Sequence, residues 1–163
     1  MVSEYARNRQ FADAQIPIVT TILRQNLGRI IKINVAEPED DMQRATDMTI
    51  QVQGGAVAVR YRRGDCKYRD FTVRSYNNGL RTEIDKLRDG FGDWYLYCWD
   101  GDGGIDWMLV DLQLVRTAGL LEGRITKMNA DGHTGFVVIP LMELNASDCI
   151  IGKGTYKGET SGI

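Results

Sequence analysis

The sequence has little of several residue types on which common enzyme classes depend. Its only histidine, His133, has no serine or cysteine partner at a readable spacing, so no catalytic triad is expected. Cys66, Cys98 and Cys149 are odd in number and form no CxxC motif, which argues against a disulfide framework and a zinc site. No GK[ST] motif follows the glycines at 101–104, so a phosphate-binding loop is not expected.

Long hydrophobic runs are also missing. No apolar stretch approaches the length of a membrane span, and residues 1–15 are too polar for a signal peptide. Together with the cysteine pattern, these absences predict a protein of the cytoplasm, in a reducing compartment, with no membrane partner.

What is present indicates a single globular domain. The chain has 163 residues, of which 43% are hydrophobic and 26% charged. Such a length suits one domain with its own core. We expect residues 1–152 to form that domain. Residues 153–163 are expected to form a flexible tail, because this stretch is polar and rich in glycine.

Charge is divided unevenly along the chain. The net charge is only −2, so the whole protein has no basic signature. Residues 37–47 nevertheless carry five acidic side chains against one arginine, and residues 60–88 carry nine basic side chains against four acidic ones. The local balance bears more on the choice of partner than the total does.

Hydrophobic periodicity predicts an α+β fold, a mixed β-sheet with packed helices and a C-terminal β-hairpin. A helix is expected over about 15–27, with a shorter one before it over about 3–13. A short strand follows at 31–35, for which continuation of the helix is the alternative. The further expected elements are strands at 48–52, 57–61 and 71–75, a helix at 83–89, a hairpin of 94–99 with 105–112, a helix at 111–118, and a hairpin of 125–129 with 136–141.

The order of helix, three-strand meander, helix and strand, with Asp47 at the mouth of a strand, resembles the PD-(D/E)XK nuclease superfamily, the restriction-endonuclease-like fold. The resemblance covers roughly residues 15–100 and rests on loose motifs. It implies an intracellular hydrolase, a DNA endonuclease or resolvase of the kind found in phages, that uses Mg²⁺ or Mn²⁺. Asp47 would be the first metal ligand.

This sequence departs from the superfamily pattern at the second acid. The positions of the acid and the lysine hold Ala58 and Arg60. Alanine cannot bind a metal, and arginine cannot lose its proton to act as a base. Glu83 and Lys86 lie three residues apart on one helix face and could replace the missing pair.

The candidate catalytic residues are therefore Asp47, Glu83, Lys86 and Arg60, with Asp47 and Glu83 as metal ligands. Simpler interpretations stand beside these roles. Asp47 could cap a turn, and Glu83 with Lys86 could form a surface ion pair near a helix N-terminus.

Basic residues alternate with tyrosines between residues 60 and 76. Arginine contacts phosphates through a forked geometry and tyrosine stacks on bases, so this segment is a candidate nucleic-acid surface. The alternative is a solubilising face that pairs with the acidic loop. The candidate binding residues are Arg60, Arg62, Arg63, Lys67, Arg69 and Arg74.

Three hypotheses follow for function. The first is a metal-dependent nuclease, and the second is a binding module that keeps a nuclease-like fold without catalysis. The third is a phage accessory protein that acts on a protein partner. Strand edges and the aromatic hairpin at 94–110 also make a homodimer plausible.

Overall fold

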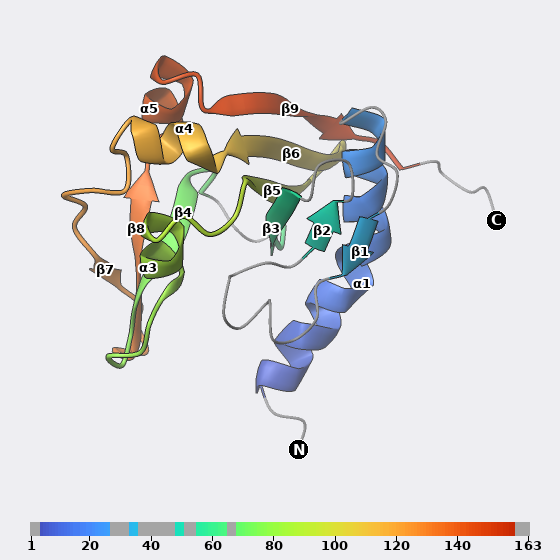
Figure 1. The fold of residues 1–163 in the computed structure, drawn as a ribbon. Coiled ribbons are helices and arrows are strands. Elements are labelled where there is room, and N and C mark those ends of the chain that lie inside the picture. The colour runs from blue at the N-terminus through green and yellow to red at the C-terminus, as the bar shows by residue number, and fades with distance from the viewer. Residues whose placement is uncertain (1–3, 27–32, 36–47, 51–54, 65–67, 159–163) are drawn as a thin grey trace.

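The fold is α+β, as the sequence predicts, with two sheets in place of one (Figure 1). A computed structural model describes residues 4–26, 33–35, 48–50, 55–64 and 68–158. Sheet A has the strand order β1-β2-β3-β5-β6-β9, and sheet B has the order β4-β8-β7. The strands of sheet A are β1 (Ile33–Val35), β2 (Met48–Ile50), β3 (Gly55–Arg62), β5 (Trp94–Gly101), β6 (Gly104–Asp111) and β9 (Ile150–Tyr156).

Helix α1 (Glu4–Asn26) covers one face of sheet A (Figure 1). Val19, Ile22 and Leu23 are buried in one cluster with Leu96 and Leu109, which belong to the central strands. Burial of such side chains contributes about 1.5–3 kcal/mol each, which fixes the helix against the sheet.

The separate helices expected at 3–13 and 15–27 are one continuous helix. Pro17 lies inside it and removes one backbone hydrogen bond. The Thr21 hydroxyl donates to the Pro17 carbonyl at 2.9 Å, and the apolar stripe continues past the proline. Packing on the sheet therefore outweighs the local break that the proline predicts.

Sheet B packs on the opposite face of sheet A. Its strands are β4 (Phe71–Asn77), β7 (Lys127–Met128) and β8 (Thr134–Ile139). Phe71 contacts Tyr95 and Tyr97 with ring centroids 5.1 and 5.6 Å apart. Val137 and Ile139 of β8 are buried in the same core cluster. Three short helices border this layer: α3 (Glu83–Arg88), α4 (Leu112–Thr117) and α5 (Leu141–Ala146).

The expected three-strand meander is wrong at its third strand. β2 and β3 pair antiparallel as predicted, but β4 leaves the sheet and pairs with β8. The next neighbour of β3 is β5, which runs parallel to it. A parallel pair needs a crossover connection, and β4 with α3 forms that connection. Alternation of Phe71 and Val73 identified a strand, but alternation does not specify the partner of a strand.

The C-terminal part differs from the expected flexible tail. The hairpin of β7 and β8 is confirmed, but α5 and β9 follow it. Residues 153–156 lie in β9, which pairs antiparallel with β6. A Cβ at Gly152 or Gly154 would lie 3.3 Å from the ring of Trp107, so these glycines let the indole lie against the strand. No helix in the described part of the chain is long and apolar enough to cross a membrane.

Candidate functional site

Glu83 lies in the first turn of α3, where Thr82 forms a capping box with Asp85. This start directs the carboxylate of Glu83 toward the strands. Its Oε2 atom is 2.6 Å from an Arg60 guanidinium nitrogen and accepts the Arg74 backbone N–H at 2.8 Å. Both side chains are largely covered, with 22% of Arg60 and 13% of Glu83 exposed.

The same ion pair closes an edge of β4. Arg60 donates its second terminal nitrogen to the Thr72 carbonyl at 3.3 Å, while Glu83 accepts the Arg74 N–H. In a strand the carbonyl of one residue and the N–H two residues later point the same way. The two charged side chains therefore occupy the hydrogen-bonding positions of a missing neighbour strand.

Tyr95 completes the pair by donating its hydroxyl to Glu83 Oε1 at 2.5 Å. Burial opposes ionisation of Glu83, but Arg60 and the donated hydrogen bonds outweigh it and hold the pKa of Glu83 below its ordinary value. Burial likewise lowers the pKa of Arg60, and Glu83 more than reverses this, so the pKa of Arg60 is raised. The pKa of Tyr95 is also raised, by burial first. The carboxylate is ionised and the tyrosine is neutral at pH 7.

Arg62 is engaged in the same interlayer space. Its guanidinium donates to the Tyr97 hydroxyl at 3.1 Å and to Thr72 Oγ1 at 2.7 Å. Arg60 and Arg62 also lie over the rings of Tyr95 and Tyr97, at 5.9 and 5.8 Å from the centroids. The expectation that these two arginines form an outward basic face is wrong, because a second sheet covers the face from which they project.

The candidate catalytic residues are brought together only in part. Glu83 and Arg60 are in contact, whereas Lys86 is a half-buried residue one turn along α3. Asp47 lies outside the described residues. Among the residues that the structure describes, no group of three or more His, Cys, Asp or Glu side chains could hold a metal ion. Both oxygens of Glu83 are already engaged by protein donors.

Three of the predicted nucleic-acid residues are exposed: Arg63, Arg69 and Arg74. Lys67 lies outside the described residues. Arg63 lies over the Phe11 ring at 4.4 Å, and Arg69 lies over the Trp99 ring at 5.7 Å. These contacts place Arg63 on the α1 side of sheet A and Arg69 on the sheet B side.

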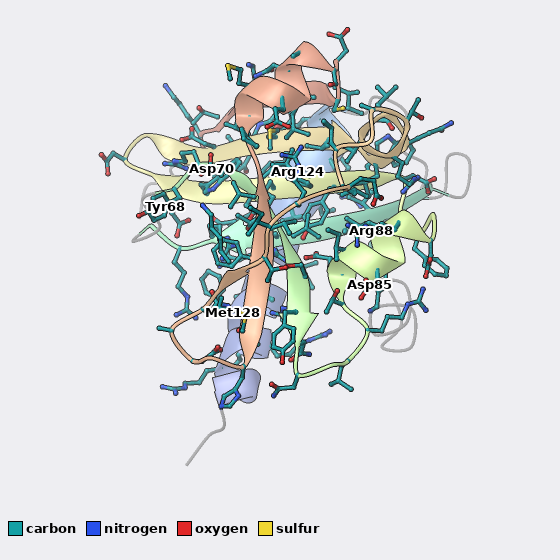
Figure 2. All side chains as sticks on the ribbon, turned by 90° about the vertical axis from the view of Figure 1, so that its left-hand side faces the viewer. Tyr68, Asp70, Asp85, Arg88, Arg124 and Met128 are labelled. Atoms are coloured by element: carbon teal, nitrogen blue, oxygen red, sulfur yellow. The ribbon has the colours of Figure 1, made fainter. Side chains whose placement is uncertain are left out.

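Arg69 is fixed at a definite position beside the hairpin of β5 and β6. Its guanidinium is 3.4 Å from the Asp106 carboxylate and 3.4 Å from the Asp100 carbonyl. The neighbouring Tyr68 is 76% exposed. Figure 2 shows Tyr68 and Asp70 together at one side of the molecule, away from α3.

A cleft of about 340 Å³ opens beside Arg69. Trp99 forms part of its wall, and the indole N–H of this buried residue has no acceptor among the described residues. Lys153 of β9 adds a second cation. The cleft is also lined by Asp106, Met108, Leu141, Asn145 and Ile150.

Sequence reasoning missed this cleft because its lining comes from five separate segments. Lys153 was assigned to a tail, and α5, which carries Leu141 and Asn145, was not expected. Trp99 is also a core residue, at 4% exposed, and its indole ring is not a feature that exposure would single out. The glycines of β9 interrupt the alternation of apolar and polar side chains by which a strand is identified in a sequence.

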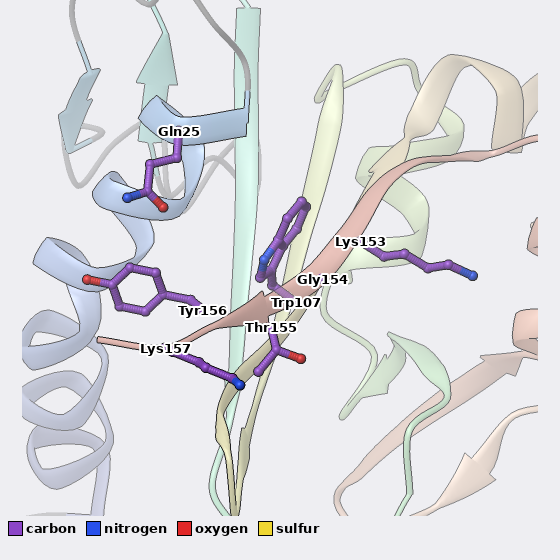
Figure 3. Close-up of a pocket in the computed structure, with 7 residues that line it drawn as sticks. All are labelled: Gln25, Trp107, Lys153, Gly154, Thr155, Tyr156 and Lys157. Atoms are coloured by element: carbon purple, nitrogen blue, oxygen red, sulfur yellow. The ribbon is translucent and has the colours of Figure 1, made fainter. Parts of the chain in front are cut away.

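A second hollow of about 340 Å³ lies along the same strand, toward α1 (Figure 3). Lys153, Gly154 and Trp107 line both hollows, and Lys157 and Gln25 line only the second. In Figure 3, Lys153 and Lys157 extend to the same side, and Tyr156 extends to the opposite side, toward α1. Lys153 in β9 and Lys157 just after it therefore place two ammonium groups along the outer edge of sheet A.

Comparisons with protein-family models, with curated proteins and with solved structures gave no match. The function is therefore inferred from the geometry of the chain itself.

Proposed function

We propose that the protein binds nucleic acid through the surface at the end of β5 and along β9. This basic surface is assigned to the exposed residues Tyr68, Arg69, Lys153 and Lys157. The observation that carries the proposal is the stacking of Arg69 on Trp99 at a cleft that Lys153 also lines. Cations beside aromatic walls suit a polymer of phosphates and bases.

The surface matches nucleic acid better than it matches an acidic protein. Phosphates are contacted by guanidinium and ammonium groups whose positions are set by neighbours, as Arg69 is set by Asp106 and Asp100. An exposed tyrosine next to this arginine adds a stacking surface. Since the net charge is only −2, attraction depends on this local surface and is expected to weaken steeply with salt.

The interior arginines support the surface without touching the ligand. Arg60 and Arg62 hold Thr72 and the edge of β4 against sheet A. The connection that carries Tyr68 and Arg69 leads directly into this strand. Their role in the proposal is therefore to position the loop.

The test is fluorescence anisotropy with labelled single-stranded DNA, duplex DNA and RNA, in low salt and over a salt series. The double variant Arg69→Gln with Lys153→Gln is expected to bind about tenfold more weakly, because two phosphate contacts are lost. Lys127→Gln is the matched control, an exposed lysine on β7 in sheet B. Equal affinity of the double variant and the parent, or no binding of any nucleic acid at low salt, would refute the proposal.

Metal-dependent cleavage remains a prediction that depends on Asp47. It is tested by incubating the protein with linear, single-stranded and branched DNA, with and without Mg²⁺ or Mn²⁺. Asp47→Ala is expected to abolish any cleavage, because an alanine cannot ligate the metal. If the protein binds DNA but does not cleave it, the binding-module hypothesis is retained. If it neither binds nor cleaves DNA, the hypothesis of a protein partner is favoured.

A further inference from the structure

The cleft lined by Arg69 and Lys153 combines cations with apolar side chains, and the proposed function does not by itself require this combination. We propose that it receives one nucleotide unit, with the phosphate between the two cations and the base against the apolar wall. The proposal rests on nucleic-acid binding for its biological source, but the cleft would recognise a free mononucleotide by the same chemistry.

The size and lining of the cleft suit a small ligand with one polar end. Ligand pockets span about 300–1,000 Å³, and a volume of about 340 Å³ lies at the small end of that range. Leu141, Ile150 and the largely buried Met108 and Trp99 supply the apolar part of the lining. A nucleobase is a flat group of matching character.

The charged residues in the lining give it a net positive charge. Arg69 and Lys153 provide two cations against the single carboxylate of Asp106. That carboxylate is engaged on both oxygens, by Thr155 Oγ1 at 2.7 Å and by Arg69 at 3.4 Å. The balance favours an anion such as a phosphate over a cation or a neutral ligand.

Polar groups that can read a base edge accompany the apolar wall. Asn145 donates its amide to the Leu141 carbonyl at 2.9 Å, which orients the side chain on α5. A side-chain amide with one N–H engaged still offers a donor and an acceptor. The indole N–H of Trp99 also has no acceptor among the described residues, but this nitrogen is itself buried and takes no part in the match.

The chain contains an internal control for the test. It has three tryptophans, and Trp94 lies at the start of β5, away from the cleft, whereas Trp99 and Trp107 line it. The indole N–H signals of the ¹⁵N-labelled protein therefore report separately on the cleft and on a distant site. The probes are adenosine 5′-monophosphate, adenosine, inorganic phosphate and a single-stranded oligonucleotide.

The expected result is that the monophosphate and the oligonucleotide shift the Trp99 and Trp107 signals and leave Trp94 unchanged. Adenosine and phosphate alone should each bind at least about tenfold more weakly than the monophosphate, because adenosine lacks the phosphate and phosphate lacks the base. Equal shifts with adenosine or with phosphate would overturn the nucleotide assignment. Oligonucleotide binding in the anisotropy assay without any Trp99 shift would overturn the cleft and leave the proposed function standing.

A shift with the monophosphate, combined with no oligonucleotide binding, would support the cleft and refute the proposed function. Two variants make the test independent of charge. Asn145→Phe fills the cleft from an exposed helix position and should remove the monophosphate shift. Gln113→Phe, at an exposed position of α4, is the matched control and should leave the shift intact. An unchanged shift in Asn145→Phe would overturn the assignment of the site.

Discussion

The carboxylate of Glu83 and the guanidinium of Arg60, 2.6 Å apart, together close the free edge of β4. The pair links α3, both sheets and Tyr95 in one hydrogen-bonded unit. Because the pair lies between the two sheets, its main role is structural. Its contacts predict how the removal of one partner should change the stability of the fold.

Glu83→Ala is expected to destabilise the fold by about 3 kcal/mol, because it leaves a largely buried guanidinium and the Arg74 N–H without their acceptor. Urea unfolding measures the effect. Glu122→Ala is the matched control, since Glu122 pairs with Arg88 on the surface at 3.3 Å and should cost at most about 1 kcal/mol. Equal losses in the two variants would show that the Glu83 pair is no more than a surface contact.

The same carboxylate predicts a pH dependence. The pKa of Glu83 is lower in the folded protein than the ordinary value of 4.5, so its contribution to stability is complete above that value. The contribution is lost as the pH falls through the folded pKa. The difference in unfolding free energy between the parent and Glu83→Gln should therefore be largest near neutral pH and shrink in acid. A difference that grows as the pH falls would contradict the assignment.

The local elements could be predicted from the sequence more readily than their pairing. Thr82 and the Ile84–Leu87 spacing predict α3, and the structure confirms that helix. The partner of β4 depends on side chains more than fifty residues away, such as Val137, which no local pattern identifies. The inward direction of Arg60 has the same cause, since alternation assigns it to the face opposite Val57 without showing that another sheet covers that face.

The proposed nucleic-acid surface predicts a specific change in salt dependence. Arg69→Gln should reduce the slope of log affinity against log salt by about 0.7 for single-stranded nucleic acid, the value for one phosphate contact. Stability should change by less than about 1 kcal/mol, because the Arg69–Asp106 pair is exposed to solvent. Anisotropy titrations over the salt series measure the slope. A slope equal to that of the parent would remove Arg69 from the interface.

Gly104 provides a test of how β9 joins the sheet. Its φ is +132°, and a Cβ at this position would lie 2.4 Å from the Tyr156 carbonyl oxygen. Gly104→Ala is therefore expected to cost about 3 kcal/mol through backbone strain and displacement of β9. Gly103→Ala, where a Cβ meets no atom within 4 Å, should be nearly neutral. Equal midpoints of urea unfolding for the two variants would contradict this account of the turn.

The candidate site was predictable only where its residues are adjacent in sequence. Arg63 and Arg69 are exposed as expected, while Lys153 and Asn145 reach the cleft through α5 and β9. Glycines obscured β9 because they are poor strand formers in isolation. In the fold they make room for the Trp107 indole, a requirement set by the neighbouring strand.

The pairing of β9 with β6 has a consequence for the order of folding during synthesis. Tyr156 is the partner of Ile105, and two strands of sheet B, β7 and β8, are translated between β6 and β9. Until residues through 156 have left the ribosome, β6 remains an exposed edge and one wall of the cleft is missing. Pairing of β9 with β6 must also overcome the conformational entropy that is lost when a long loop is closed. Because non-local contacts form slowly, the basic surface forms late in folding.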